Sequence, residues 1–196
     1  LYALKALKDE GFVPAKKIKF IAGCNEECGW ACIEHYNEVN TMPEEGFSPD
    51  GSFPVIYAEK GILHVRLHFP MGEKPPFFFL EGGSSANMVC DECSATPRTL
   101  TLTRARDLGL EIRNKKLIAH GKSAHGSTPE LGVNAILPIL KFFEEKSEQV
   151  RYIIDCVFND KFRLTELEDE TGKLTLSPDM IKYRKGEIQV ICDIRY

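Results

Sequence analysis

The chain has 196 residues, of which 43% are hydrophobic, and a formal net charge of -4. This length and content allow one large domain or two small ones with buried cores. The negative charge argues against a nucleic-acid surface, and no stretch of sequence approaches the roughly 20 apolar residues of a membrane span. We therefore expect a soluble, cytoplasmic protein whose ligand is a small solute or a metal, with no nucleic acid and no membrane as partner.

The first part of the chain predicts two helices with a strand between them. Residues 1–12, LYALKALKDEGF, have apolar residues at helical spacing and predict a helix that ends at Gly11. Residues 17–23, KIKFIAG, predict a strand, and residues 26–39 return to helical spacing. This order is typical of a wound α/β domain. The chain starts without Met and within a helical pattern, so we expect a fragment of a longer protein.

The second part of the chain has a different character. The segment 41–54 is rich in Pro and Gly and predicts a loop, so we place a domain boundary between residues 56 and 57. Residues 57–196 predict an α+β domain with a ferredoxin-like arrangement of strands and helices. The predicted strands fall within 57–69, 110–125, 173–183 and 187–196, and the predicted helices within 131–146 and 147–160. Residues 72–87, GEKPPFFFLEGGSSAN, are loose enough in composition to predict a mobile segment.

Two adjacent glutamates, Glu26 and Glu27, follow the strand predicted over residues 17–23 directly. Adjacent carboxylates repel each other and are buried only beside a cation or a proton partner. A purely structural explanation is an acidic helix start with Asn25 as the N-cap. Asp50, after a proline in the following loop, offers another explanation, since a chain returning to the same sheet edge would bring it near Glu27. Two carboxylate ligands and one free carboxylate would then form a metal site with its own base.

The seven cysteines do not form the dense, even pattern of a secreted disulfide framework. Cys90 and Cys93 form a CxxC motif, and Cys24, Cys28 and Cys32 are spaced by four. A structural zinc ion requires four ligands, and the sequence offers no second pair at a matching distance. We therefore favour buried, reduced thiols that pack as small hydrophobic groups.

Three elements in fixed order resemble the dinuclear zinc peptidases, in particular the bacterial dipeptidase V (carnosinase-like) branch. They are NEECGW (25–30), GFSPDGSFPVIYAEKGI (46–62) and GKSAHGSTPELGVNA (121–135). The resemblance covers essentially the whole chain, with a looser and shorter match over 75–113. It implies hydrolysis of dipeptides by zinc-activated water, with two zinc ions per active site. Residues 1–56 would be part of the catalytic domain, and residues 57–196 a lid and dimerisation-like domain that is incomplete at its C-terminus.

The resemblance also implies roles for the three acidic residues of the first domain. Glu26 matches the general base that takes a proton from the attacking water. Glu27 matches a carboxylate ligand of one zinc ion, and Asp50 matches a ligand of the other. Further ligands in this family come from an upstream His-x-Asp motif and a downstream histidine. We therefore expect that residues 1–196 alone hold no stable dinuclear site and are inactive.

Three residues of the second domain match contacts to the substrate. His125 matches a lid histidine that stabilises the tetrahedral oxyanion, whereas the structural alternative is a capping or surface histidine. Arg195 matches an arginine that binds the substrate carboxylate, and the alternative is a solvated charge at a strand end. Asn87 matches a polar contact to substrate. His64 and His68 fit a half-exposed strand better than a ligand pair.

Two other functions stay open at this stage. A related amidohydrolase, such as a deacylase or desuccinylase of N-acyl amino acids, would use the same residues. A non-catalytic lid module acting in assembly is the second alternative, and a homodimer is left open in either case.

Overall fold

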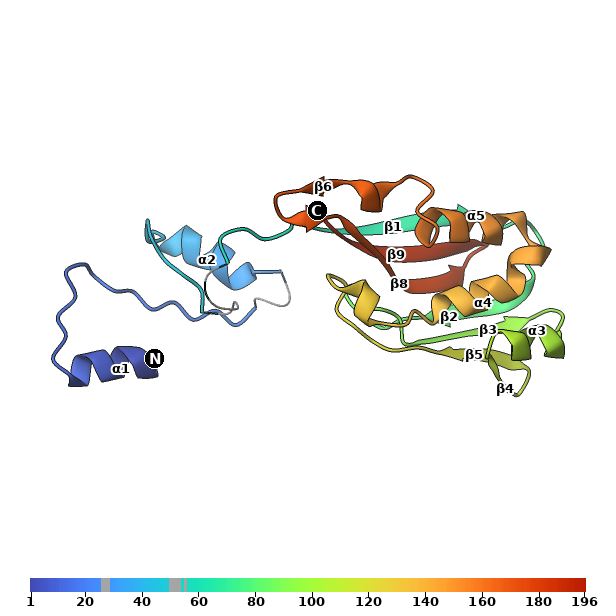
Figure 1. Ribbon diagram of the computed structural model, residues 1–196, viewed down its shortest axis with the longest axis horizontal. Coiled ribbons are helices and arrows are strands. Elements are labelled where there is room, and N and C mark those ends of the chain that lie inside the picture. The colour runs from blue at the N-terminus through green and yellow to red at the C-terminus, as the bar shows by residue number, and fades with distance from the viewer. Residues whose placement is uncertain (26–28, 50–53, 55) are drawn as a thin grey trace. The chain divides into compact units, whose positions relative to one another are not determined.

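The computed structural model describes residues 1–25, 29–49, 54 and 56–196. The chain divides into two compact units, Leu1–Ile56 and Tyr57–Tyr196. In Figure 1 the first unit is coloured from blue to teal and the second from teal to red. The division lies directly after the segment 41–54, which is rich in proline and glycine. Backbone of this composition forms few long-range contacts, so a boundary between units is favoured there.

The first unit contains two short helices among its described residues. Helix α1 spans Tyr2–Asp9, which confirms the predicted helix, and Gly11 follows it with a left-handed φ of 78°. Helix α2 spans Ala31–Val39 and begins later than predicted, after Trp30, whose φ is also left-handed. The strand predicted over residues 17–23 is wrong, because these residues form neither a strand nor a helix. The described residues of this unit include no strand that could pair with the backbone groups of residues 17–23.

The second unit is built on a seven-stranded sheet in the order β1-β9-β8-β2-β3-β5-β4, with every neighbouring pair antiparallel. A separate two-stranded hairpin, β6 with β7, precedes β8 along the chain. The strands span Ile62–Pro70 (β1), Phe77–Gly82 (β2), Glu92–Pro97 (β3), Glu111–Arg113 (β4), Lys116–His120 (β5), Glu168–Asp169 (β6), Gly172–Lys173 (β7), Thr175–Arg184 (β8) and Glu187–Arg195 (β9).

Helices α4 (Ile136–Phe143) and α5 (Glu148–Val157) pack on one face of this sheet (Figure 1). A side chain accepts a backbone N–H at the start of each helix, from the N-cap residue in α5 and from the residue before the N-cap in α4. The Asn134 Oδ1 accepts the backbone N–H of Ile136 at 2.9 Å, and the Ser147 Oγ accepts that of Val150 at 3.3 Å. The other helical segments are α3 (Leu102–Asp107), η2 (Pro129–Leu131), η3 (Glu144–Lys146) and η4 (Leu164–Glu166).

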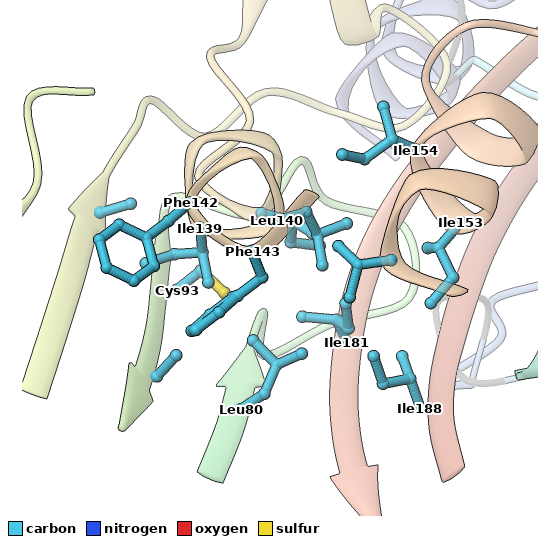
Figure 2. Packing of buried hydrophobic residues seen from close by; sticks show 14 of the residues in the cluster. Leu80, Cys93, Ile139, Leu140, Phe142, Phe143, Ile153, Ile154, Ile181 and Ile188 are labelled. Atoms are coloured by element: carbon cyan, nitrogen blue, oxygen red, sulfur yellow. The ribbon is translucent and has the colours of Figure 1, made fainter. Parts of the chain in front are cut away.

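The core lies between these two helices and the sheet (Figure 2). Helix α4 turns a stripe of apolar residues toward the strands, as its helical spacing predicts. The ring of Phe143 meets that of Phe77 edge to face, with centroids 5.1 Å apart. Side chains of β2, β8 and β9 complete the layer, including Leu80, Ile181 and Ile188.

The segment 72–87 is not the loose region that the sequence predicts. It contains β2, an interior strand that pairs with both β3 and β8, and its Phe77 and Leu80 are fully buried. The four segments predicted to hold strands do contain β1, β4 with β5, β8 and β9, and the two predicted helices are confirmed as α4 and α5. The ferredoxin-like arrangement stays a prediction.

Candidate functional site

The three acidic residues predicted for a metal site, Glu26, Glu27 and Asp50, lie outside the described residues. The residues that flank the glutamates are described. The Oδ1 of Asn25 accepts the backbone N–H of Ala31, the first residue of α2, at 2.9 Å. Its backbone carbonyl accepts the N–H of Trp30, also at 2.9 Å. Asn25 therefore satisfies a backbone N–H at the start of α2, but the N-cap residue of this helix is Trp30 and not Asn25 as predicted.

The described part of the chain contains no group of three or more His, Cys, Asp or Glu side chains placed to hold a metal ion. Zinc prefers nitrogen and sulfur ligands in a complete tetrahedral set. The two carboxylates assigned as ligands, Glu27 and Asp50, do not supply such a set by themselves. To hold a pair of zinc ions, Glu27 and Asp50 would therefore need further ligands.

The CxxC motif lies in the core. Cys90 and Cys93 are both buried and neither forms a disulfide. A hydrogen bond with Cys90, together with burial, raises the pKa of the Cys93 thiol well above its usual value. A thiol in this state is a poor metal ligand, because zinc binds the thiolate. These observations support the interpretation of Cys90 and Cys93 as small hydrophobic groups, whereas Cys24 is exposed and does not fit the prediction of buried thiols.

His125 lies on an exposed loop that pairs with a second loop around Asn87. Met88 forms an isolated antiparallel bridge with His125, and the N–H of Gly126 donates to the carbonyl of Asn87 at 2.7 Å. The His125 ring accepts the backbone N–H of Ser127 at Nδ1, at 3.3 Å, and its Nδ1 lies 2.7 Å from the Ser127 Oγ. Because Nδ1 accepts, the proton of the neutral ring is on Nε2. The loop thus presents an exposed N–H donor.

Asn87 is partly buried and lies next to the His125 loop. Its Oδ1 accepts a hydrogen bond from the Ser85 Oγ at 2.5 Å, which fixes the orientation of the side-chain amide. The Nδ2 group then points away from Ser85 and has no hydrogen-bond partner among the described residues. The structure therefore brings together two of the predicted substrate contacts, although they are 38 positions apart in the sequence.

Arg195 is not the solvated strand-end charge of the structural alternative, because only 10% of its side chain is exposed. Its Nε and Nη2 both donate to the carboxylate of Asp193, at 2.9 and 2.8 Å. The two residues are two apart on β9 and so share one face of the strand. This fork-to-fork geometry is the strongest form of a charged hydrogen bond in proteins.

Asp193 also connects Arg195 to the His125 loop. A Cβ atom on Gly126 would lie 2.3 Å from the Asp193 Oδ2, so the glycine backbone rests directly against the carboxylate. On the other side, His64 of β1 places its Nε2 3.9 Å from the Asp193 Oδ1. Arg195 therefore binds this buried carboxylate directly, and the loop that carries His125 and pairs with Asn87 rests against it through Gly126.

A second buried acid, Asp179, lies beside this pair. The Ser177 Oγ donates to its Oδ1 at 2.5 Å, and its Oδ2 has no hydrogen-bond partner among the described residues. Burial raises the pKa of Asp179 to about 7, and the neighbouring charge of Asp193 adds to the rise. The hydrogen bond from Ser177 and the charge of Arg195 act in the opposite direction. Asp179 therefore exchanges its proton close to neutral pH.

No family model matches the chain. The chain is 32% identical to "Putative dipeptidase YtjP" of Bacillus subtilis (strain 168), over 95% of the chain and 46% of that protein. It is 26% identical to the Beta-Ala-Xaa dipeptidase of Lactobacillus delbrueckii subsp. lactis, over 100% of the chain and 47% of that protein. The resemblance to dipeptidases is confirmed. This dipeptidase-like chain spans about half the length of the curated relatives it matches.

Sequence reasoning missed the two acids at the centre of the site. Asp179 and Asp193 stand in strands, where a charged residue usually faces solvent. One signal was available, because Asp193 and Arg195 are spaced by two on a predicted strand and so share a face.

None of the described helices has both the length and the apolar content needed to cross a bilayer.

Proposed function

We propose that the protein containing this dipeptidase-like chain hydrolyses dipeptides in a zinc-dependent reaction. The observation that carries the proposal is that Arg195 binds Asp193, against which the His125 loop rests through Gly126, while Asn87 pairs with that loop. These residues come from three distant parts of the sequence, and together they offer donors for both ends of a small, charged substrate. The names of the relatives supply the substrate class.

His125 supplies a donor suited to a developing negative charge. Its Nδ1 is occupied by Ser127, so Nε2 carries the proton, and the ring is exposed on its loop. When water attacks a peptide carbonyl, the carbonyl oxygen gains charge in the transition state. A neutral Nε2–H donor then stabilises the transition state more than it stabilises the substrate.

Arg195 supplies a donor suited to a charge that is present from the start. Asp193 occupies the Nε and Nη2 positions, and Nη1 has no hydrogen-bond partner among the described residues. A planar guanidinium with one edge held and one edge available matches the terminal carboxylate of a dipeptide. Arg195 would therefore act mainly on binding.

The acidic residues of the first unit complete the proposal. Bound zinc ions would act as Lewis acids and lower the pKa of a coordinated water. Glu27 and Asp50 would each serve as a carboxylate ligand, alongside further ligands from the rest of the full-length protein. Glu26 would take the proton from the attacking water and pass it to the leaving amine.

The proposal is tested by replacing each glutamate in turn, because Glu26 is assigned as the general base and Glu27 as a metal ligand. In the full-length protein, Glu26→Gln should keep its metal content and lose about 10²-fold or more in turnover, because general-base catalysis contributes that much. Glu27→Gln should lose metal first. Metal analysis beside initial rates measures both effects, and equal metal loss in the two variants would reject the assignment.

Substrate choice separates dipeptide hydrolysis from the activity of a related deacylase or desuccinylase. A dipeptide carries an ammonium group at the end where an N-acyl amino acid carries a neutral or acidic acyl chain. We expect higher kcat/KM for free dipeptides than for N-acetyl or N-succinyl amino acids with the same C-terminal residue. The reverse order would favour the amidohydrolase.

A further inference from the structure

Four polar residues of the described chain are buried, and all four lie together on β8 and β9. They are Ser177, Asp179, Asp193 and Arg195. Cys192 belongs to the hydrophobic core under the helices, so Asp193, the next residue on β9, points to the opposite face of the sheet. A cluster of this kind is costly to bury, and its charges must be matched by partners.

The carboxylate of Asp193 contacts both Arg195 and the loop that carries His125. Oδ1 accepts from the Arg195 Nε at 2.9 Å, and Oδ2 accepts from Nη2 at 2.8 Å. The backbone of Gly126, next to His125, lies against Oδ2 so closely that a Cβ atom would not fit. One carboxylate therefore fixes both the rotation of the guanidinium and the position of the loop.

The charges around Asp193 come from three strands. On β9 it faces Arg195, on β8 it faces Asp179 and its partner Ser177, and on β1 it faces His64. Arg195 is the only one of these groups that forms a bidentate pair with it. If Asp193 were removed, the guanidinium would lose both bonds that hold its plane.

We propose that Asp193 is a positioning residue, which holds Arg195 with its Nη1 edge available to a substrate carboxylate and supports the loop that presents His125. This inference rests on the proposed function and adds to it the group that orients both substrate contacts. Asp193 does not touch the substrate. It acts through Arg195 on binding of the carboxylate and through Gly126 on the position of the His125 Nε2–H.

The first test uses the full-length protein and two substrates, a dipeptide and its C-terminal amide. Asp193→Asn keeps the shape of the side chain and loses one acceptor for the guanidinium. We expect KM for the dipeptide to rise about 10-fold, with a change of less than about 3-fold for the amide. In an Arg195→Ala background, Asp193→Asn should give no further rise. An equal rise for both substrates, or the same rise in both backgrounds, would overturn the proposal.

A matched control removes a carboxylate from the other end of the same strand. Glu187→Gln breaks a hydrogen bond with His68 on β1 and leaves the buried cluster intact. We expect unchanged KM for both substrates.

Gly126→Ala tests the contact between the His125 loop and Asp193 without changing any charge, because the added methyl group must displace either the loop or the carboxylate. It should lower kcat about 10-fold for both substrates, and an unchanged kcat would remove the loop from the proposal.

A measurement that does not need activity separates this inference from the proposed function. In the full-length protein labelled with ¹⁵N-arginine, a guanidinium held by two bonds shows slow rotation and a protected Nε–H signal. Arg195→Lys assigns the signal. Asp193→Asn should abolish its protection, and a protected signal in this variant would overturn the positioning role. If the wild type hydrolysed no dipeptide, the proposed function would fail, and this spectrum would still decide whether Asp193 holds Arg195.

Discussion

Replacing Asp179 with asparagine should stabilise the second unit, and the gain should grow with pH. Asp179 is fully buried, and only its Oδ1 has a hydrogen-bond partner among the described residues. Asparagine keeps the shape and the Oδ1 acceptor for the Ser177 hydroxyl. It removes the ability to ionise in a buried site that already contains the charge of Asp193.

The magnitude follows from the pKa of Asp179, which burial raises from 3.8 to about 7. Between these two pH values, the folded state holds a proton that the unfolded chain has released, so raising the pH lowers the stability of the folded state. Above about pH 7 the loss is complete. At about 1.4 kcal/mol per pH unit, the whole loss is at most about 4 kcal/mol. Between pH 5 and pH 8, the stability of Asp179→Asn relative to wild type should therefore rise by about 2 to 3 kcal/mol.

Thiol labelling measures this effect in the second unit alone. Cys93 and Cys156 are buried there and react with a thiol reagent only after the unit opens. The ratio of labelling rates between variant and wild type at one pH removes the intrinsic pH dependence of the thiol. Asp107→Asn, at an exposed position on α3, is the matched control. A difference for Asp179→Asn that does not change with pH, or that grows in favour of the wild type, would refute this reasoning.

Three further predictions concern the core and the two substrate contacts. Phe143→Ala should lower the free energy of unfolding by about 3 to 5 kcal/mol in urea titrations, because the buried ring that packs against Phe77 leaves a cavity. In the full-length protein, His125→Ala should lower kcat about 10²-fold with little change in KM, since its Nε2–H acts mainly on charge in the transition state. Arg195→Ala should mainly raise KM for a dipeptide, and equal weakening for the C-terminal amide would assign Arg195 a structural role.

Helices α4 and α5 and the strands β1, β4, β5, β8 and β9 could be predicted from local pattern. Helices α4 and α5 have an apolar stripe and a capping residue within a few positions of each other, so the signal is complete in the sequence. Strand β2 could not be predicted in this way, because its Phe run does not alternate and is flanked by proline and glycine. Its place is fixed by partners far along the chain, such as Glu81 with Lys182. The pattern at 17–23 failed for the opposite reason, since alternation without a partner strand does not make a sheet.

The candidate site likewise depends on contacts between residues that are far apart in the sequence. The resemblance pointed to His125, Asn87 and Arg195, and the structure places all three in the second unit. The sequence did not show that a carboxylate joins them, because the burial of Asp193 depends on the packing of Gly126 from a distant loop. Pairing between strands and loops that are far apart in sequence is set by the whole fold and is only weakly encoded by neighbouring residues.

Hydrolysis of a free dipeptide by the full-length protein, before and after removal of its metal, tests the central claim most directly. We predict that the purified protein releases both amino acids, that a chelator abolishes the release, and that added zinc restores it. Release that persists at the same rate after the metal has been removed, or no release from any dipeptide in the presence of zinc, would contradict the account.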